Sequence, residues 1–539
     1  MSCPDSFCTI CTNNASHEFI GLLYSLSIHH PNSTIYCLID NITENILKNL
    51  TLKPKLNIIT KTSLNKYSNK NRHIMLHEKI WDDFQLEKAN AIKFALESSN
   101  DTMFLDSDII FFNPLNNIDK SKDINVSPHF IKQENIDEVG YYNGGCLWTK
   151  NKNVPNDWIK YTKTSRYHDQ AALEDLVKIY SFKELSEEIN VMPWRVLVGE
   201  NPQQVKSNFN IQNNNIYYKN KPLVFFHTHF LDQRFIEVNK IVINILMKLK
   251  RYKEIIIIDR IINNKWILQI PKQPMQGLWK HNNDSFRELA VLCSNKNKDI
   301  VITFTNSKHC MFAQHILLYD RPNLQWFNKK LQKALLVLLG NGDIKNEGVI
   351  LQNNNVNVKP FIFWPRNPQI YEDFLNKNER KKYNERNNET IFIGNIENNV
   401  QDKFRNNNIN WDNVISDYHI TNGTKHKFTQ QEYLNKMCNS KFGLTLRGYG
   451  SKCHREVELM GLGTIPIITP DVNIDSYLDP PIENIHYIKV DKPEELKNKI
   501  KNITETQWEE MSENCLKWYM KNVHSKNGFA FILENIMYK

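Results

Sequence analysis

The sequence predicts an α/β protein with two successive units, each built on a mainly parallel sheet. Residues 7–12 form an apolar strand pattern, residues 17–30 have helical apolar spacing, and residues 34–39 form the next strand. This is the order of a right-handed βαβ unit. Strand and helix patterns alternate again after residue 299. Since 539 residues exceed what one hydrophobic core supports, we expect about two to four domains.

Charge and composition exclude several classes of protein. The net charge of +9 comes from scattered Lys and Arg without a long basic run, which suits phosphorylated small molecules rather than nucleic acid. No secretory signal is evident, and the most apolar windows fall short of the ~20 residues that span a bilayer. We therefore expect a cytoplasmic protein without a membrane span. The 10 Cys include one C-x-x-C, Cys8 and Cys11, without the further ligands of a zinc site, so reduced thiols are expected.

The strongest signal for a site is the stretch 101–114, DTMFLDSDIIFFNP. Asp106, Ser107 and Asp108 lie between two apolar runs that indicate buried strands. Ionised carboxylates are costly to bury unless a cation or hydrogen-bond donors compensate them. Hard oxygen ligands at a strand end suit Mg²⁺ or Mn²⁺ that carries a phosphate. The alternative is a turn in which the two Asp side chains cap the strand, but the apolar flanks favour the metal.

Polar residues at other predicted strand ends are candidates to bind a ligand, because ligands of parallel sheets bind at the carboxyl ends of the strands. Around the end of the first strand these residues are Thr9, Thr12 and Asn14. Before the apolar strand at 146–148 they are Asn143, Gly144 and Gly145. The paired glycines either permit close approach of a ligand or form a tight turn.

Two further groups combine acidic, amide and imidazole side chains. Polar His168, Asp169 and Gln170 lie at the entrance of a helix predicted over 166–175, where Asp169 could also be a first-turn residue that the helix dipole favours. The strand at 223–226 ends in His227 and His229, which alternation places on one face. Two histidines on one face at a strand end favour a metal-ligand role, whereas a single one would more often be structural.

The second unit begins after a segment that contains Pro and Gln, PKQPMQG. Strands are predicted at 299–305, 360–364 and 390–393, and helical spacing at 309–318. The charged segment 376–388 is predicted to be an exposed helix or a linker between two lobes.

A second candidate site follows the predicted strand 441–446. Arg447 and Gly448 open a glycine-containing turn that leads into a helix predicted over 453–462, and the start of a helix favours an anion. Arg447 and Arg455 can each bind phosphate oxygens through a planar fork. Arg455 and Glu458 share a helix face, so Glu458 could accept hydrogen bonds from ribose hydroxyls. The alternative is an exposed Arg455–Glu458 ion pair worth ~0.3–0.5 kcal/mol.

Residues 1–265 resemble GT-A glycosyltransferases of the glycogenin-like and lipopolysaccharide galactosyltransferase group. The resemblance rests on FCTICTNN, LDSDIIFFNPL, NGGCLW, HDQAALED and FFHTHF. It implies a Rossmann-like GT-A fold in which Asp106 and Asp108 hold Mn²⁺ and the donor diphosphate. His227 best matches the late metal ligand, with His229 as its rival. The chain departs from the group because LDQ follows HTHF, where Lys-Pro-Trp is usual.

The same resemblance implies roles for the remaining residues of the first unit. It implies donor contacts for Thr9, Thr12, Asn14 and Ser107. It places Asn143, Gly144 and Gly145 in the loop on the sugar side. It places Asp169 and Gln170 beside the reacting carbon of the sugar.

Residues 285–525 resemble exostosin-like GT-B glycosyltransferases, through SKFGLTLRGYGSKCHREVELMGLGTIPIIT. The resemblance implies donor contacts for Arg447, Gly448, Arg455 and Glu458. The expected domains are a GT-A domain at 1–265, a linker at 266–284, an N-terminal GT-B-like lobe at 285–385, and a donor-binding lobe with a C-terminal helix at 386–539. The composition, rich in Asn, Ile and Lys, is similar to that of proteins of large DNA viruses of protists, so a viral chain would lie in the host cytoplasm.

Together the resemblances imply a bifunctional glycosyltransferase. Its donors would be nucleotide-sugars, UDP-sugars above all, its acceptor a glycan or glycoprotein, and its cofactor Mn²⁺ or Mg²⁺ in the first domain. One alternative is a single active GT-A domain with a C-terminal module that only binds sugar or nucleotide. A metal-dependent nucleotidyltransferase also uses paired Asp, but residues 7–14 lack the glycines that cradle a triphosphate.

Overall fold

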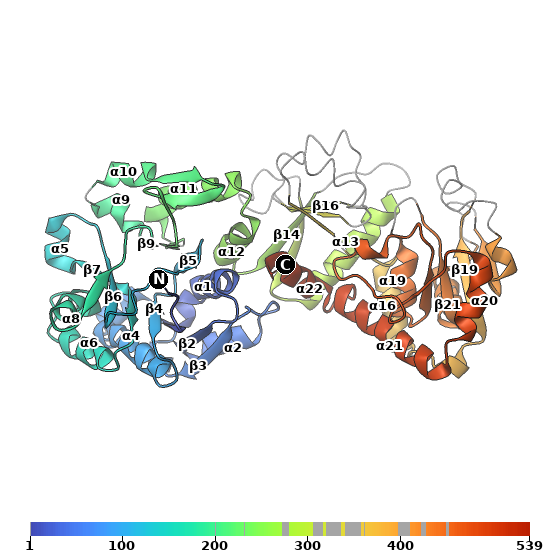
Figure 1. Ribbon diagram of the computed structural model, residues 1–539, viewed down its shortest axis with the longest axis horizontal. Coiled ribbons are helices and arrows are strands. Elements are labelled where there is room, and N and C mark those ends of the chain that lie inside the picture. Colours follow the sequence, from blue (N-terminus) through green and yellow to red (C-terminus); the bar gives the residue numbers. More distant parts are fainter. Residues whose placement is uncertain are drawn as a thin grey trace. The chain divides into compact units, whose positions relative to one another are not determined.

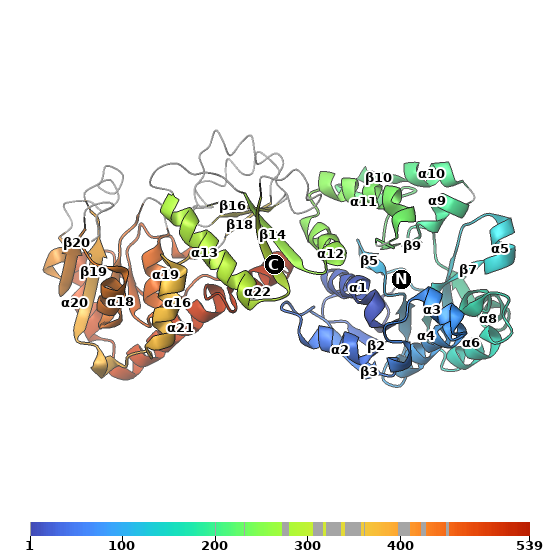
Figure 2. The same ribbon diagram turned by 180° about the vertical axis from the view of Figure 1, so that it is seen from behind.

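The computed structural model describes residues 2–199, 201–230, 232–271, 280–305, 316–319, 336–339, 357–360, 362–396, 410–421, 427–448 and 452–538. The chain divides into two compact units, Met1–Trp266 and Ile267–Lys539. Figure 1 and Figure 2 show the elements of each unit from opposite sides. The division lies next to residue 265, where the sequence places the end of the first domain. The four-part domain scheme as a whole stays a prediction.

A seven-stranded sheet with the order β3-β2-β1-β4-β7-β6-β8 forms the centre of the first unit. Its strands are β1 (Ser6–Cys11), β2 (Thr34–Ile39), β3 (Asn57–Thr62), β4 (Thr102–Leu105), β6 (Ile124–Pro128), β7 (Tyr142–Thr149) and β8 (Phe182–Glu184). Strands β3, β2, β1 and β4 run parallel, and β7 runs antiparallel to its neighbours β4 and β6. Strands β1 and β4 therefore end at the same edge of the sheet.

The side chains of β1 alternate between two apolar cores. Phe7 and Cys11 pack in the core that α1 (Ser16–His29) covers, whereas Cys8 and Ile10 pack in the core that α4 (Trp81–Leu96) covers. The two thiols of the C-x-x-C thus face opposite sides of the sheet, which agrees with the prediction that they form no zinc pair. Further helices are α2 (Asn41–Lys48), α3 (Arg72–His77), α5 (Gln133–Val139), α6 (Val154–Thr162), α7 (His168–Ala171) and α8 (Leu173–Ile179).

A small sheet with the order β5-β13-β9 brings distant segments to the end of β4. Its strands are β5 (Ile109–Phe111), β9 (Asn190–Val191) and β13 (Phe225–His227). Strand β13 pairs antiparallel with β5, which sets His227 opposite Ile109. This pairing carries the end of β13 to the turn between β4 and β5. A separate hairpin sheet consists of β10 (Phe209–Gln212), β11 (Asn215–Tyr218) and β12 (Lys221–Pro222).

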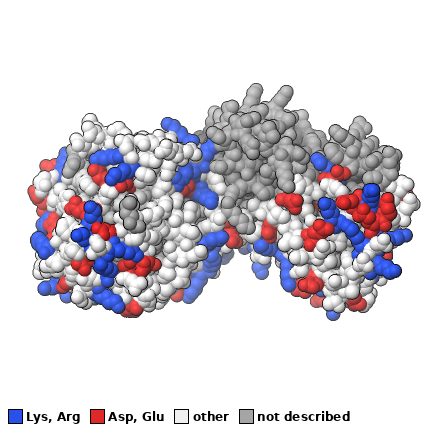
Figure 3. Space-filling view, viewed as in Figure 1, with Lys and Arg blue, Asp and Glu red and all other residues white. Residues whose placement is uncertain are grey.

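The described part of the first unit also contains the helices α9 (Trp194–Val198), α10 (Pro202–Ser207), α11 (Ile236–Lys248) and α12 (Tyr252–Asn263). In Figure 3 acidic and basic side chains are interspersed over the visible face of this unit. Among the described residues, no helix combines the length and the apolar character that crossing a bilayer requires.

The second unit contains a fully parallel five-stranded sheet with the order β20-β19-β21-β22-β23. Its strands are β19 (Asn388–Gly394), β20 (Asp417–Ile420), β21 (Ser440–Thr445), β22 (Ile465–Ile468) and β23 (Ile488–Lys489). If β19 is counted as strand 1, the strand order is 2-1-3-4-5. The order in which strands are added to the sheet therefore reverses between β19 and β21. The helices around it are α16 (Pro368–Lys377), α18 (Gln430–Cys438), α19 (His454–Gly461), α20 (Pro493–Lys501), α21 (Glu505–Asn522) and α22 (Gly528–Tyr538).

The described remainder of the second unit is β14 (Trp266–Pro271), α13 (Lys280–Lys296), β15 (Ile300–Thr305) and a parallel three-stranded sheet. That sheet consists of β16 (Ile316–Tyr319), β17 (Leu336–Leu339) and β18 (Asn357–Pro360).

The α/β class with mainly parallel sheets is confirmed, and two predicted elements are wrong. Residues 316–318 belong to a strand rather than to the helix predicted over 309–318, because a short apolar run fits either period. Residues 309–315 lie outside the described residues. The strand predicted at 360–364 is also wrong, because β18 ends at Pro360 and residues 362–364 have no regular structure.

Candidate functional site

The two predicted metal-binding carboxylates lie on the turn that connects β4 to β5. The strands on both sides are fully buried. The backbone of the turn is held at both ends: the N–H of Asp106 donates to the carbonyl of Gly145 at 2.9 Å, and Thr228 N–H donates to the carbonyl of Asp108 at 2.9 Å. Rigid backbone anchoring leaves the carboxylates of Asp106 and Asp108 to face His227 at the end of β13.

Asp106, Asp108 and His227 form a group whose ligand atoms all lie within 4.8 Å of one another. Nε2 of His227 is 3.3 Å from Oδ1 of Asp108 and 3.7 Å from Oδ2 of Asp106. Ligands around one Mg²⁺ at about 2.1 Å are separated by distances of this order. The three side chains can therefore converge on one divalent cation, with oxygen and imidazole ligands that suit Mn²⁺ or Mg²⁺.

His229, the other predicted ligand, lies beside this group. Its Nδ1 is 2.8 Å from Oδ2 of Asp108, and its ring stacks on that of His227 with a centroid distance of 5.8 Å. The two rings thus lie on one side of the strand end, as alternation predicts. His227 therefore lies near both carboxylates, whereas His229 contacts Oδ2 of Asp108.

Without a metal, the negative charges of the carboxylates in this group are balanced by protons on imidazole. Burial would lower the pKa of His227, but the charges of Asp108 and Asp106 override burial and raise it to about 9. Burial opposes ionisation of Asp108, yet His229 and His227 hold its pKa well below the usual value. A proton on imidazole thus balances the carboxylates, and a divalent cation would replace that proton.

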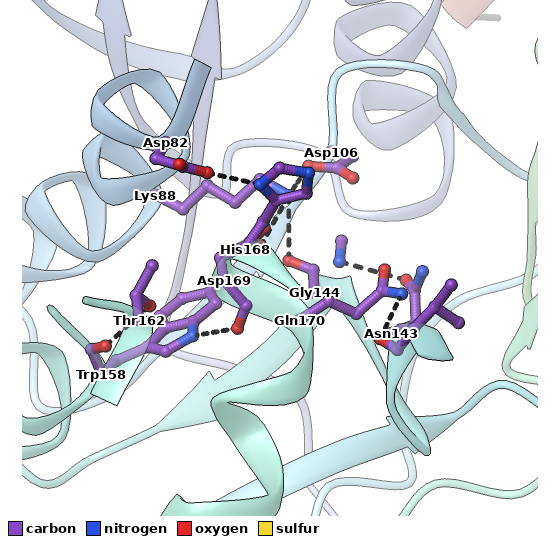
Figure 4. A network of polar contacts seen from close by, with 12 residues as sticks. Asp82, Lys88, Asp106, Asn143, Gly144, Trp158, Thr162, His168, Asp169 and Gln170 are labelled. Atoms are coloured by element: carbon purple, nitrogen blue, oxygen red, sulfur yellow. Dashed lines mark hydrogen bonds and ion pairs between the residues drawn. The ribbon is translucent and has the colours of Figure 1, made fainter. Parts of the chain in front are cut away.

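Lys88 is a member of the site that the sequence patterns do not single out. It extends from α4, is 7% exposed, and places Nζ 3.2 Å from Asp106, 3.1 Å from Asp169 and 3.3 Å from the carbonyl of Gly144 (Figure 4). Burial lowers the pKa of Lys88, but the two carboxylates more than reverse this and raise it. One buried ammonium thereby links the metal-side carboxylate to Asp169.

The paired glycines lie inside strand β7 and make room for these carboxylates. A Cβ on Gly144 would lie 2.3 Å from Oδ2 of Asp169, and one on Gly145 would lie 2.3 Å from Oδ2 of Asp106. The sequence predicted a turn or a loop that a ligand approaches. The structure shows instead that the protein's own carboxylates occupy the space in which side chains at these two positions would lie.

Asn143 and Gln170 are oriented by neighbouring backbone and amide groups. Oδ1 of Asn143 accepts from Gly145 N–H at 3.1 Å and from Nδ2 of Asn190 at 3.3 Å. Nε2 of Gln170 donates to the carbonyl of Val139 at 3.0 Å. Burial raises the pKa of the Asp169 carboxyl in spite of Lys88. The residues predicted to lie on the sugar side thus share one region with the acidic turn.

The residues predicted to contact the donor near the end of β1 differ in how deeply they are buried. Thr9 is 0% exposed within β1, so its side chain does not reach the edge of the sheet. Thr12 follows the strand and is buried, whereas Asn14 is exposed. Ser107 is half-buried in the acidic turn. Because β1 and β4 are parallel neighbours, Thr12 and Ser107 follow strands that end at one edge.

In the second unit, Arg455 and Glu458 are buried and form no ion pair among the described residues. Nη2 of Arg455 donates to the carbonyl of Ile393 at 2.8 Å, whereas Nε and Nη1 are buried without a hydrogen-bond partner in the described part of the chain. Glu458 accepts from the N–H of Arg366 at 2.8 Å and from the hydroxyl of Tyr433 at 2.7 Å. The exposed ion pair considered as an alternative is therefore wrong.

Arg455 lies at the point in the sheet of the second unit where the strand order reverses. Its partner Ile393 is near the end of β19, and α19 follows β21, the strand next to β19. Arg447 and Gly448 follow the end of β21, while residues 449–451 of the predicted glycine turn lie outside the described residues. Ligands of open parallel sheets bind at this point.

Comparison with known proteins gives solved structures only. No protein-family description and no curated protein matches the sequence. The galactosyltransferase LgtC with donor and acceptor sugar analogues is 14% identical, with 41% of this chain and 86% of that chain covered and a TM-score of 0.28. The glycosyltransferase GlyE of Streptococcus pneumoniae is 11% identical, with 93% and 99% covered and a TM-score of 0.30. Mouse xyloside xylosyltransferase 1 is 10% identical, with 41% and 96% covered and a TM-score of 0.29. Identity and TM-score are both low, so function is argued from the site.

Proposed function

We propose that the first unit is a metal-dependent glycosyltransferase. It moves a sugar from a nucleotide-sugar, with UDP-sugars as the first candidates, to a hydroxyl of a glycan or glycoprotein. The observation that carries the proposal is the group of Asp106, Asp108 and His227 at the carboxyl edge of the sheet, where nucleotides bind in parallel α/β proteins.

The residues of the site divide between the leaving group and the sugar. Asp106, Asp108 and His227 would hold Mn²⁺ or Mg²⁺, which when bound stabilises the charge that develops on the diphosphate. We assign nucleotide contacts to Thr12, Asn14 and Ser107 at the same edge. Thr9 drops out of this set because it is fully buried within β1, before the end of the strand.

On the sugar side we assign Asp169 and Gln170 to the reacting carbon, with Asn143 beside them. Lys88 holds the carboxylate of Asp169 at 3.1 Å, and Trp158 holds its backbone carbonyl at 2.7 Å. Both contacts fix Asp169 before a ligand arrives, which is what a positioned catalytic group requires.

The substitution Asp108→Asn tests this proposal. It removes one charged ligand and should lower Mn²⁺-dependent release of UDP from UDP-glucose or UDP-galactose by roughly 10²-fold or more. Asp175→Asn, a half-buried residue of α8 that pairs with Lys178, is the matched control and should keep the wild-type rate. Metal-dependent turnover that survives Asp108→Asn would contradict the assignment.

A second candidate function concerns the second unit, which we propose to bind the diphosphate of another nucleotide-sugar. The supporting observation is Arg455, whose buried Nε and Nη1 lack partners among the described residues at the switch point of the sheet. The full proposal is a bifunctional enzyme, and its alternative is a C-terminal module that only binds.

The Asp108→Asn variant separates these two possibilities. UDP that still binds to this variant without metal, and no longer binds after the further change Arg455→Gln, would support the second site. Sugar transfer by Asp108→Asn would indicate two activities, whereas binding without transfer would indicate a module.

A further inference from the structure

His168 and Asp82 form a pair that the proposed function does not use. Asp82 lies in the first turn of α4, and His168 is the first residue of α7. Nδ1 of His168 forms a hydrogen-bonded ion pair with Oδ1 of Asp82 (Figure 4). When Nδ1–H donates to a carboxylate, the lone pair of a neutral imidazole lies on Nε2. No described residue forms a polar contact with Nε2, so this atom can accept a proton.

The pair lies next to the sugar side of the site. His168 directly precedes Asp169, whose carboxylate is 3.1 Å from Nζ of Lys88, and the same Nζ is 3.2 Å from Asp106. Helix α4 carries both Asp82 and Lys88, so it fixes the imidazole and the two carboxylates together. In Figure 4 Asp82 lies on one side of the imidazole and Asp106 lies towards the other.

The backbone of His168 indicates that the ring is held in place. Its φ of 43° is in the left-handed region, which is uncommon for residues other than glycine, although His adopts it more often than most. Such a conformation is costly and persists where surrounding contacts enforce it, often at functional sites. An exposed ion pair stabilises only weakly, so the contact with Asp82 does not by itself explain the strained backbone.

The surroundings of the pair suit a sugar. Trp81 presents its ring edge-on to His168 at a centroid distance of 6.4 Å, and Tyr167 lies at 4.8 Å. Both aromatic side chains are half-buried. Arg72 adds hydrogen-bond donors over Trp81 and beside the hydroxyl of Tyr167. Aromatic faces with a few polar groups between them bind ligands that are flat and apolar on one side and polar at the rim.

We propose that His168 is the catalytic residue that receives the proton of the acceptor, and that the acceptor is a sugar hydroxyl. This inference rests on the proposed function of the first unit. The acceptor oxygen forms a bond to the anomeric carbon of the donor as the bond from that carbon to the diphosphate oxygen breaks. The diphosphate leaves with the electron pair, and the hydroxyl proton moves to Nε2 of His168. Asp82 orients the ring and stabilises the imidazolium that forms.

The substitution His168→Asn tests this role with little change to the fold. Asn tolerates the left-handed backbone, and its amide N–H can replace Nδ1–H towards Asp82, but it has no atom in place of Nε2. With UDP-glucose or UDP-galactose, Mn²⁺ and lactose, we expect kcat to fall roughly 10²-fold or more. The KM for the donor should stay at the wild-type value, since the metal group is untouched.

Two further measurements separate a chemical role from a structural one. Added imidazole should restore part of the rate to His168→Ala, because a small base can occupy the space of the lost ring. Asp82→Asn should lower kcat less than His168→Asn, whereas Asp83→Asn, its exposed neighbour, should leave kcat unchanged.

The outcomes distinguish this inference from the proposed function. A wild-type protein that neither binds UDP with Mn²⁺ nor releases it overturns both. A wild-type rate in His168→Asn overturns the role of His168 alone, and so does a raised donor KM with unchanged kcat. Loss of kcat with an unchanged donor KM and rescue by imidazole supports it.

Discussion

Lys88 connects the two halves of the candidate site through a single ammonium group. It is buried between Asp106 and Asp169, at 3.2 and 3.1 Å. A buried carboxylate that loses its cationic partner keeps the full cost of desolvation. The site therefore depends on Lys88 for stability as well as for the orientation of Asp169.

We expect Lys88→Met to destabilise the metal-free protein by about 3 kcal/mol, because the buried carboxylate of Asp169 then lacks its cation. Chemical denaturation of the first unit measures this loss. Mn²⁺ should recover part of it in the variant by neutralising Asp106. Lys93→Met, on the same helix and half-exposed, is the control with little expected change. Equal stability of Lys88→Met and the wild type would contradict the prediction.

Site residues that interrupt a local apolar pattern could be predicted from the sequence. Residues whose role depends on contact with a distant element could not. The acidic turn was visible because Asp106 and Asp108 interrupt buried apolar runs. Lys88 left a weaker signal, since it lies four residues after Phe84 on the apolar stripe of α4, where a lysine is out of place. Asp82 meets His168 only through the packing of α4 against α7, which no local pattern contains.

At the scale of elements, the strands and helices around the site follow their apolar periods closely. Strand β2 has the predicted bounds, and α1 is displaced by one residue. The apolar run at 146–148 predicts that the paired glycines precede a strand, where they allow close approach of a ligand or form a tight turn. Their position inside β7 depends on the space that Asp169 and Asp106 need, which is a tertiary effect.

The end of α1 is attached to the segment after β5 by a histidine that must remain neutral. Nε2 of His30 accepts from Leu115 N–H at 2.8 Å, and its ring is buried against Phe7 and Phe111. Burial, with a smaller contribution from His29, lowers the pKa of His30 to about 4. Protonation would abolish the acceptor and place a charge in the core.

We predict an acid-sensitive contribution of His30 to stability. The unfolded chain binds this proton near pH 6.5 but the folded chain only near pH 4. Stability is therefore lost as the pH falls from 6.5 to 4, by about 3 kcal/mol relative to a variant that cannot titrate. Denaturation of the wild type and of His30→Gln, whose amide oxygen can still accept from Leu115, at several pH values measures the difference. A difference that stays constant with pH would contradict the prediction.

At the scale of the whole molecule, each unit has its own apolar packing, and in each the strand order reverses at one point of a mainly parallel sheet. The first site uses carboxylates and imidazole, which need a cation to bind a diphosphate. The proposed second site uses Arg455, whose guanidinium would bind an anion directly. The two units should therefore respond differently to the same nucleotide.

Thermal unfolding of the full chain tests this difference. UDP with Mn²⁺ at about 100 times its Kd should stabilise the first unit by about 2.7 kcal/mol, which raises the Tm of that unit by several degrees. Asp108→Asn should abolish this shift, because the metal group is then incomplete. UDP with a chelator should shift only the transition of the second unit, and Arg455→Gln should cancel that shift. If the chelator removes every effect of UDP, the second unit binds no nucleotide by itself. Arg455 then has a structural role in the sheet rather than a role in binding a ligand.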